Sequence, residues 1–364
     1  MRTLVSVQKI VSTAPIEGAD RIELAYILGW QCVTQKSNNF KPGDLVAYFE
    51  VDSLVPLDVP QFEFLRKKED QTQARIKTIK LKGKFAQGLI LPLDTITEII
   101  QAKTHSNTPI TYDEGDDLTE TLGVLKWEPE IPAQLAGQVV GLFPSFVSKT
   151  DETRIQSAPS VLEKNIGLPV FITEKLDGSS ITVFYVKRNQ PGLPAKYLEG
   201  NDDEMIFGVC SRNLCVSRTE DNAFWKATEI LDLKDKLIAY GKPIVLQGEL
   251  IGPGVQHNKL NFPSLTVRWF NVGDPETRTY FNFKEFTSTI KDLGLETVPI
   301  LAQDIPLDFT VDQLVTYSIG RSKFNDKVWR EGIVVRPMEE QQERHLGRFS
   351  FKVINPEFLV KYDA

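Results

Sequence analysis

The stretch Lys175-Leu176-Asp177-Gly178 is the centre of the pattern that decides the fold of this 364-residue chain. It follows an apolar, strand-like run at 170–174 and precedes a second strand pattern at 181–185, with two serines between. The pattern predicts a lysine at the mouth of a β-hairpin, with a carboxylate two residues later. Such a lysine is a plausible nucleophile on a rigid platform. Taken alone, a surface lysine in a turn is the commoner explanation.

Five further segments follow this lysine in a fixed order. They are Ser211-Arg212-Asn213, Leu246-Gln247-Gly248-Glu249-Leu250, Arg268-Trp269-Phe270-Asn271-Val272, Glu331-Gly332-Ile333-Val334-Val335-Arg336 and Phe351-Lys352-Val353-Ile354-Asn355. Read together, the six motifs resemble those of covalent nucleotidyltransferases, the superfamily of polynucleotide ligases and mRNA capping enzymes. Within it the chain is most similar to ATP-dependent RNA ligases of the subfamily with an N-terminal OB domain, typified by the Deinococcus RNA ligase.

The resemblance implies that Lys175 attacks the α-phosphate of ATP and forms a lysyl-adenylate. A free lysine has a pKa of about 10.4, so we expect a nearby metal ion and partial burial to depress it. Asp177 is expected to support the site and engage the incoming end. Glu174 is a candidate acceptor for the adenine amine. Either carboxylate could instead bond local backbone at a strand end.

The resemblance also assigns roles to three residues on other motifs. Arg212 is expected to bind phosphate, since its planar donor fork matches phosphate oxygens, and Asn213 to lie on the 3′-hydroxyl side of the reaction. Phe270 matches the aromatic residue that stacks on adenine, for which a flat apolar face is needed. In isolation, Phe270 would more often be a core aromatic.

Two glutamates are candidate metal ligands. A carboxylate at the end of a buried strand, such as Glu249, is costly unless it is paired or binds metal. The resemblance implies that Glu249 contacts the ribose or a metal-bound water and that Glu331 coordinates metal. Mg²⁺ or Mn²⁺ is the expected ion, since Mg²⁺ takes one or two carboxylates together with substrate phosphates.

The last motif departs from the common family pattern. Lys352 is expected to hold the α-phosphate, but many relatives carry a second lysine two residues earlier, where this chain has Ser350. One phosphate contact is therefore missing or comes from elsewhere. The alternatives are Arg348, Arg344, Arg336 and, more weakly, Lys361.

Short strand patterns between turns dominate the first 95 residues, notably at 4–11, 22–28, 30–34 and 45–50. They predict a small barrel or sandwich, and the resemblance implies an OB-like barrel. We therefore expect an α+β chain with an OB-like domain plus connector over 1–140 and an adenylyltransferase domain with antiparallel sheets over 141–364. Helices are predicted from about 223 to 240, capped by Asp221-Asn222 and stopped by Gly241, and from 283 to 293.

The segment from 75 to 84 is the strongest basic feature. It contains Arg75, Lys77, Lys80, Lys82 and Lys84. We expect an RNA-contacting strand with a bulge at Thr78-Ile79. The alternative is an edge strand that lysines protect from pairing.

Composition excludes several other classes. No run of about 18 apolar residues predicts a membrane helix. The three cysteines and three histidines make no zinc pattern, which favours free thiols in a cytoplasmic or other reducing compartment. A net charge of −7 argues mildly against a general polyanion binder.

The function we expect is sealing of 3′-OH/5′-phosphate ends, with nicks in an RNA or RNA/DNA duplex, RNA on the 3′-OH side, as the substrate that the resemblance implies. DNA ligases and capping enzymes place an OB domain after the last motif, whereas here the barrel pattern comes first and the chain ends soon after Asn355. The alternatives are a capping-type guanylyltransferase and an inactive nucleic-acid-binding homologue. We expect a monomer without a membrane partner.

Overall fold

The computed structural model describes residues 3–127, 138–199 and 203–362. They form two compact units. Unit 1 takes Met1–Glu130, Gln156–Pro159 and Pro356–Ala364, and unit 2 takes Ile131–Ile155 and Ser160–Asn355. The first boundary lies after residue 130, where we expected one at 140. Unit 1 also takes two later segments, Gln156–Pro159 and Pro356–Ala364, which we expected in the second domain. Among the described helices, none is long and apolar enough to cross a membrane.

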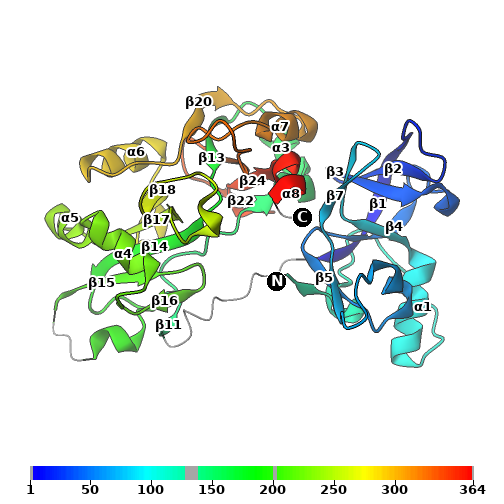
Figure 1. The fold of residues 1–364 in the computed structure, drawn as a ribbon, viewed down its shortest axis with the longest axis horizontal. Helices are drawn as coiled ribbons and strands as arrows, with labels where there is room; N and C mark the ends of the chain where they lie inside the picture. The colour runs from blue at the N-terminus through cyan, green and yellow to red at the C-terminus, as the bar shows by residue number, and fades with distance from the viewer. Residues whose placement is uncertain (1–2, 128–137, 200–202, 363–364) are drawn as a thin grey trace. The chain divides into compact units, whose positions relative to one another are not determined.

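Unit 1 is built on a five-stranded antiparallel sheet of order β3-β2-β1-β4-β9 (Figure 1). Strand β1 serves two partners: its first half pairs with β4, and its second half pairs with β2 after a register shift between Ile10 and Ser12. Such an irregularity bends a strand and increases its twist, and the sheet curls as an OB-fold requires. The strands are β1 (Val5–Pro15), β2 (Ile22–Ile27), β3 (Trp30–Gln35), β4 (Leu45–Phe49) and β9 (Leu89–Pro92).

The two faces of this sheet carry two apolar clusters. Val5 and Val7 pack with Phe49 and Phe62 in one cluster, whereas Ile10 packs with Trp30 in the other. This follows from the period of two in β1, which turns Ile10 to the face opposite to that of Val5 and Val7. The remaining elements of unit 1 are η1 (Lys36–Asn38), β5 (Ser53–Pro56), η2 (Pro60–Leu65), β6 (Gln73–Arg75), β7 (Thr78–Leu81), β8 (Lys84–Gln87), α1 (Leu93–Thr104), α2 (Thr119–Leu122), β10 (Leu125–Lys126) and α8 (Pro356–Tyr362).

The basic segment at 75–84 is not the single strand that we expected. It spans the end of β6, all of β7 and the start of β8, and β7 and β8 pair as a hairpin. Lys82 and Gly83 form its turn with φ values of 47° and 78°. Two successive residues with positive φ are typical of a type I′ turn, whose twist matches that of a hairpin.

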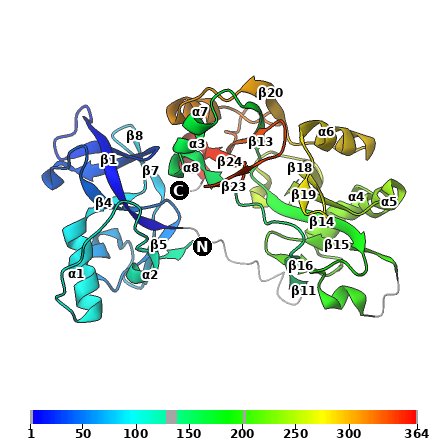
Figure 2. The ribbon, with the colours of Figure 1, turned by 180° about the vertical axis from the view of Figure 1, so that it is seen from behind.

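Unit 2 contains a seven-stranded sheet of order β11-β16-β15-β14-β17-β18-β19 (Figure 2). All its pairs are antiparallel. The central strands are apolar on both faces, in keeping with burial on both sides. The strands are β11 (Val139–Leu142), β14 (Ser179–Lys187), β15 (Met205–Cys210), β16 (Leu214–Val216), β17 (Ile244–Ile251), β18 (Thr266–Asp274) and β19 (Thr279–Tyr280).

Three helices bury their apolar faces against this sheet: α4 (Ala223–Ile230), α5 (Leu233–Tyr240) and α6 (Phe283–Asp292). The predicted helix over 223–240 is in fact two helices, since Asp232 takes a left-handed conformation with φ of 50°. The predicted caps are confirmed: the Asn222 side chain accepts bonds from the first turn of α4, and Gly241 ends α5 in the left-handed region. The helix predicted from 283 is also confirmed.

A second sheet of unit 2 has the order β12-β24-β21-β13-β20. Only the short pair β12–β24 is parallel among its described pairs. The elements of this half are β12 (Thr153–Arg154), α3 (Ser160–Lys164), β13 (Pro169–Lys175), β20 (Ile300–Pro306), α7 (Val311–Ser318), β21 (Gly332–Pro337) and β24 (Phe351–Ile354). The small elements η4 (Ile155–Ser157), η5 (Ala195–Leu198), η6 (Gln256–Asn258), β22 (Gln342–Glu343) and β23 (Gly347–Arg348) complete the described structure.

Gly332 lies where three strands of the second sheet crowd together. It pairs with Lys175 on β13 and with Ile354 on β24. A Cβ atom at this position would lie 2.2 Å from the Val353 carbonyl oxygen. Glycine is therefore required here for close backbone approach.

We predict that Gly332→Ala lowers the free energy of unfolding by about 1–3 kcal/mol, the usual cost of overpacking. The melting temperature followed by circular dichroism should fall by several degrees. Gly273→Ala on β18 is the matched control, since its nearest atom would be 3.1 Å away. Equal melting temperatures for both variants would contradict the crowding argument.

Candidate functional site

Lys175 ends β13 and faces a carboxylate from the neighbouring strand. Its Nζ donates to both Oε1 and Oε2 of Glu331, each at 2.7 Å. Glu331 directly precedes β21, and Lys175 pairs with the next residue, Gly332, in the sheet. The register of β13 and β21 thus places two motifs 156 residues apart side by side.

Two more carboxyl groups surround this ion pair. Glu249 on β17 accepts a bond from the backbone N–H of Gly178 at 3.1 Å. A Cβ atom on Gly178 would lie 2.4 Å from the Leu250 carbonyl oxygen, so glycine lets the turn reach β17. Asp177 accepts a bond from Lys259 Nζ at 2.6 Å.

The negative charges of these carboxyl groups repel one another. Burial, with the nearby Glu331 and Asp177, raises the pKa of Glu249 to about 8, although Lys175 lowers it. Burial and Glu331 also raise the pKa of Asp177, despite the bond from Lys259. The site therefore holds more acidic groups than its lysines neutralise.

The pKa of Lys175 moves in the opposite direction to our expectation. Burial lowers this pKa, but Glu331, Glu249 and Asp177 raise it by more, so that the net shift is upward. The carboxylates stabilise the ammonium form, which cannot act as a nucleophile. Loss of their negative charge to a cation would remove the cause of the upward shift.

Glu174 precedes Lys175 and is buried. Its Oε2 accepts the Lys323 backbone N–H at 2.8 Å, whereas Oε1 is buried without a hydrogen-bond partner among the described residues. Burial raises the pKa of Glu174. A buried acceptor without a partner is costly, so a ligand donor at Oε1 would be favourable.

Phe270 lies on β18, partly buried, in an apolar cluster with Leu176 and Val298. The guanidinium of Arg336 lies 5.6 Å from the centre of its ring. The Phe270 ring thus lies near Leu176, the residue that follows Lys175, and keeps some exposed surface.

The turn between β15 and β16 carries Arg212 and Asn213. Arg212 is exposed and contacts Asp151, with Nη2 and Oδ1 3.2 Å apart. Asn213 accepts the Phe143 backbone N–H through its own carbonyl. No described contact joins either residue to Lys175.

Lys352 on β24 also contacts Asp151, with Nζ and Oδ1 3.1 Å apart. Burial lowers the pKa of Lys352 to about 8, and Lys175 contributes in the same direction. Lys352 therefore lies within electrostatic reach of Lys175.

Ser350 and Arg336 are both buried and belong to one network. Arg336 donates to Ser350 Oγ at 3.0 Å, to the Phe270 carbonyl at 3.0 Å and to Glu152 Oε1 at 2.9 Å. Burial raises the pKa of Glu152, but the charges of Arg336 and Lys352 lower it by more, so that the pKa is about 2. Arg336, one of the alternatives to the missing lysine at position 350, thus already bonds three groups of the protein.

Arg348 is also engaged, by Glu340 and by Asn271 Oδ1. Arg344 is exposed, and Lys361 lies on α8 in unit 1. None of these side chains is brought to Lys352 by a described contact.

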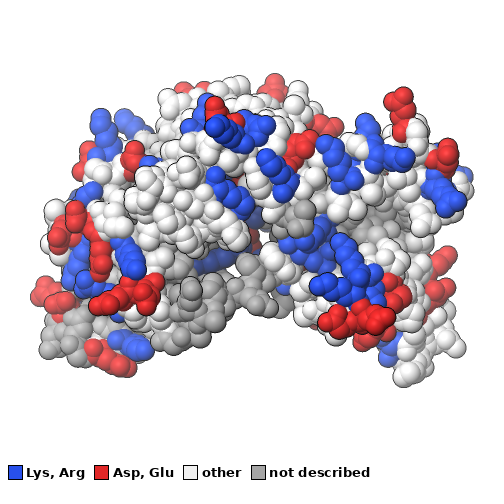
Figure 3. Space-filling view, in the orientation of Figure 1, with Lys and Arg blue, Asp and Glu red and all other residues white. Residues whose placement is uncertain are grey.

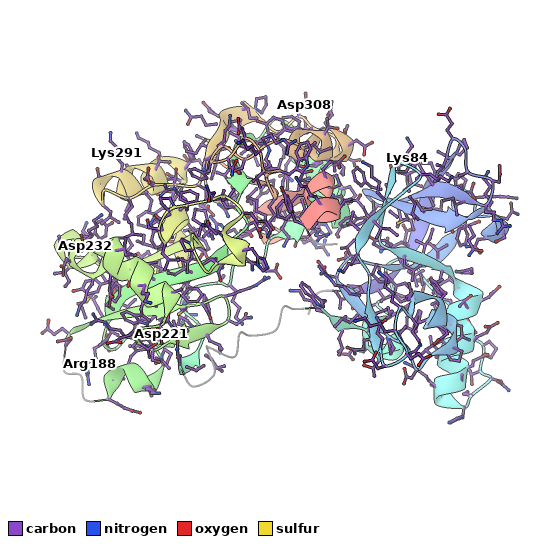
Figure 4. All side chains as sticks on the ribbon, viewed as in Figure 1. Lys84, Arg188, Asp221, Asp232, Lys291 and Asp308 are labelled. Atoms are coloured by element: carbon purple, nitrogen blue, oxygen red, sulfur yellow. The ribbon has the colours of Figure 1, made fainter. Side chains whose placement is uncertain are left out.

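The basic residues of unit 1 differ in their surroundings. Arg75 bonds Asp52 at 2.6 Å and lies 3.5 Å from the centre of the Trp127 ring, so it is used within the unit. Lys80 bonds Glu357 at 3.0 Å, and Lys77 is partly buried. Lys82 and Lys84 are exposed at the hairpin tip, and Figure 4 labels Lys84. Basic side chains gather in patches on both units in Figure 3.

Sequence reasoning missed Asp151, Glu152 and Lys259. Asp151 and Glu152 precede β12 and carry no motif signal, and Lys259 follows a strand end by eight residues. Their charged partners Arg212, Asp177, Arg336 and Lys352 lie 61 to 201 residues away in the chain. Two adjacent acidic residues in a loop, such as Asp151 and Glu152, indicate a site only when the strand order is known.

Comparisons with known proteins identify the family and the fold of the chain. A family model described as RNA ligase matches residues 168–354, just over half of the chain, and one described as OB-fold domain matches residues 4–93. A comparison with curated proteins finds no match.

Solved structures of the Naegleria gruberi RNA ligase are similar over the full length. A variant with AMP and Mn is 34% identical with a TM-score of 0.82, covering 100% of this chain and 99% of that one. A variant with ATP and Mn is 34% identical with a TM-score of 0.81, covering 99% of each chain. The ligase with PPi is 34% identical with a TM-score of 0.82, covering 100% of this chain and 99% of that one. On this evidence, the chain belongs to the RNA ligase family and carries an OB-fold domain in front of its ligase domain.

Proposed function

We propose that this chain is an ATP-dependent RNA ligase that seals 3′-OH/5′-phosphate ends through a lysyl-AMP on Lys175. The observation that carries the proposal is the position of Lys175, bonded to Glu331 and surrounded by Glu249 and Asp177. The similar Naegleria gruberi ligase has been solved with ATP, AMP, PPi and Mn, which supports ATP and a divalent ion as its cofactors.

The site residues fit a divalent cation. Among the described residues no three His, Cys, Asp or Glu side chains form a ready-made metal cluster, but Mg²⁺ needs only one or two protein carboxylates with water and phosphate. The raised pKa of Glu249, caused by burial and nearby carboxylates, indicates the negative charge that a cation would offset. Glu249 and Glu331 would hold it. A bound Mg²⁺ or Mn²⁺ would neutralise charge on these carboxylates and on the nucleotide phosphates.

The protein residues position ATP for attack. Glu174 Oε1, buried and without a described partner, would accept the adenine amine, and Phe270 would stack on the base. Lys352 and Arg212 would bind phosphate. Lys175, once deprotonated, attacks the α-phosphorus and forms a P–N bond while pyrophosphate leaves.

Two further transfers complete sealing. A 5′-phosphate oxygen attacks the lysyl-AMP and gives a 5′-5′ adenylate, which releases Lys175. A 3′-hydroxyl then attacks the adenylated 5′ end and releases AMP. Asp177 and Asn213 are proposed to engage these ends. Each step is an in-line transfer that depends on positioning and charge neutralisation.

We also infer that Lys82 and Lys84 contact RNA phosphates. Both are exposed at the tip of the β7–β8 hairpin, on the unit matched by the OB-fold model. Lys80 would join them if its bond to Glu357 were exchanged for a bond to an RNA phosphate. For Lys77, an RNA contact stays a prediction from the sequence. Arg75 is not assigned to the RNA contact, because its side chain already contacts Asp52 and Trp127.

Lys175→Ala should abolish self-adenylylation. Incubated with ATP and Mn²⁺, the parent protein should gain the mass of one AMP in intact mass spectrometry, and the variant none. Lys291→Ala removes an exposed lysine of α6, keeps the nucleophile and should still gain one AMP. A GMP adduct formed from GTP would favour the capping-type alternative, and no adduct with either nucleotide would favour an inactive homologue.

RNA on the 3′-OH side of a nick should be required for efficient sealing. We propose that the enzyme reads the 2′-hydroxyl and A-form shape there. Nicked duplexes that differ only in RNA or DNA at the six terminal 3′-OH nucleotides should be sealed at least about tenfold faster with RNA, the effect of losing about 1.4 kcal/mol of transition-state stabilisation. Equal sealing rates for the two duplexes, measured on gels, would refute the preference for RNA on the 3′-OH side. Faster sealing of single strands would refute the preference for nicked duplexes.

The double variant Lys82→Ala/Lys84→Ala should weaken RNA binding without altering self-adenylylation. Loss of two phosphate contacts should reduce the slope of log affinity against log salt by about 1 per lysine. Lys67→Ala/Lys68→Ala removes two other exposed lysines of unit 1 and is the control. Filter binding at several salt concentrations measures both slopes, and identical slopes would exclude the hairpin tip from the RNA contact.

A further inference from the structure

One carboxylate oxygen lies between the two cations that we assign to phosphate. Asp151 Oδ1 is 3.1 Å from Lys352 Nζ and 3.2 Å from Arg212 Nη2. The two cations come from different sheets, Lys352 from β24 and Arg212 from the β15–β16 turn. A single acceptor therefore brings together groups that neither sheet alone would align.

The backbone on either side of Asp151 is fixed. Glu152 is partly buried, forms an ion pair with Arg336 and also accepts a bond from Ser350 Oγ at 3.4 Å. Thr153 and Arg154 form β12, which pairs with Phe351 and Lys352 of β24. The backbone of Asp151 is thus held directly before this paired segment, in which Arg154 lies opposite Lys352, whereas the Asp151 side chain remains 33% exposed.

This arrangement matches the one that a phosphate oxygen would make. A phosphate oxygen between a lysine and an arginine accepts the same charge-assisted bonds as a carboxylate oxygen. Such bonds are usually about 2.7–2.9 Å long, so the observed 3.1 Å and 3.2 Å contacts are loose. A loosely held, partly exposed carboxylate can be replaced by a more highly charged ligand.

We propose that Asp151 is an internal counterion that occupies the place of a nucleotide phosphate oxygen between Lys352 and Arg212, and that it is displaced when the polyphosphate of ATP binds. The inference rests on the proposed function, in which these two cations bind phosphate. Asp151 then sets the affinity for ATP, because each binding event must break its contacts with Lys352 and Arg212. It is a positioning residue and takes no part in bond making.

The charge of Lys352 fits this role. Burial lowers its pKa to about 8, and Asp151 is the main group that acts against this effect. Without a counterion the buried ammonium would be costly in the nucleotide-free enzyme. The counterion therefore keeps the phosphate-binding cation charged until its ligand arrives.

Asp151→Asn tests the proposal in single-turnover self-adenylylation at varied ATP, with Mn²⁺ at pH 6.5, below the pKa of Lys352. We expect half-saturation at about three- to tenfold lower ATP, the size of effect of partly exposed ion pairs. The maximal rate should stay within about twofold, because no group that touches the reacting atoms has changed. Asp151→Ser is a second variant in case the asparagine protein is unstable.

Two controls separate displacement from other effects. Asp308→Asn removes the same charge from an exposed site on unit 2, labelled in Figure 4, and should leave half-saturation unchanged. In an Arg212→Gln background, the gain from Asp151→Asn should shrink, since the contact between Asp151 and Arg212 is already lost.

Unchanged or weaker ATP binding in both Asp151 variants would overturn the proposal, as would an equal gain in Asp308→Asn or an undiminished gain beside Arg212→Gln. Failure of the parent protein to form any adenylate would instead overturn the proposed function, and this inference with it.

Discussion

The bond between Lys175 and Glu331 depends on one strand register. Lys175 pairs with Gly332 across β13 and β21, which places the side chain of Glu331 against the Nζ atom. A shift of one residue would turn Lys175 to the opposite face of its sheet. The apolar residues of β13 and the buried glycine at 332 fix this register, so core packing and the position of the nucleophile are the same constraint.

The junction between the two sheets of unit 2 supplies the other charges. Strand β13 belongs to one sheet and β14 to the other, and the turn at Leu176–Gly178 joins them. Because Gly178 lacks a Cβ atom, this turn reaches β17 and meets Glu249. Burial, together with the excess of carboxyl groups, raises the pKa of Glu249. Burial lowers the pKa of Lys175, but the carboxyl groups raise it by more. The free site therefore stores the lysine as an ammonium ion and is suited to a cation that would relieve this charge.

The departure from the family pattern at Ser350 has a structural explanation. The Arg336 guanidinium fills the neighbouring space and bonds Ser350, Glu152 and the Phe270 carbonyl. A lysine at 350 would bring a second buried cation against Arg336, at a cost that one carboxylate would not offset. Serine completes the hydrogen bonding of Arg336 instead. This network also fixes the segment that carries Asp151.

The order of motifs, the caps at Asn222 and Gly241 and the strand-rich first domain were determined by the sequence alone, because local pattern and residue chemistry specify them. The same signals led to the proposal of Lys175 as the nucleophile. The split at Asp232 and the hairpin turn at Lys82-Gly83 were not, since each depends on single residues in the left-handed region. Only the tertiary structure decided that Arg75 serves Asp52 and Trp127, that Arg336 is internal, and that Asp151 joins Lys352 to Arg212. These pairings join residues 14 to 201 positions apart, and no local signal reports which distant group a side chain will meet.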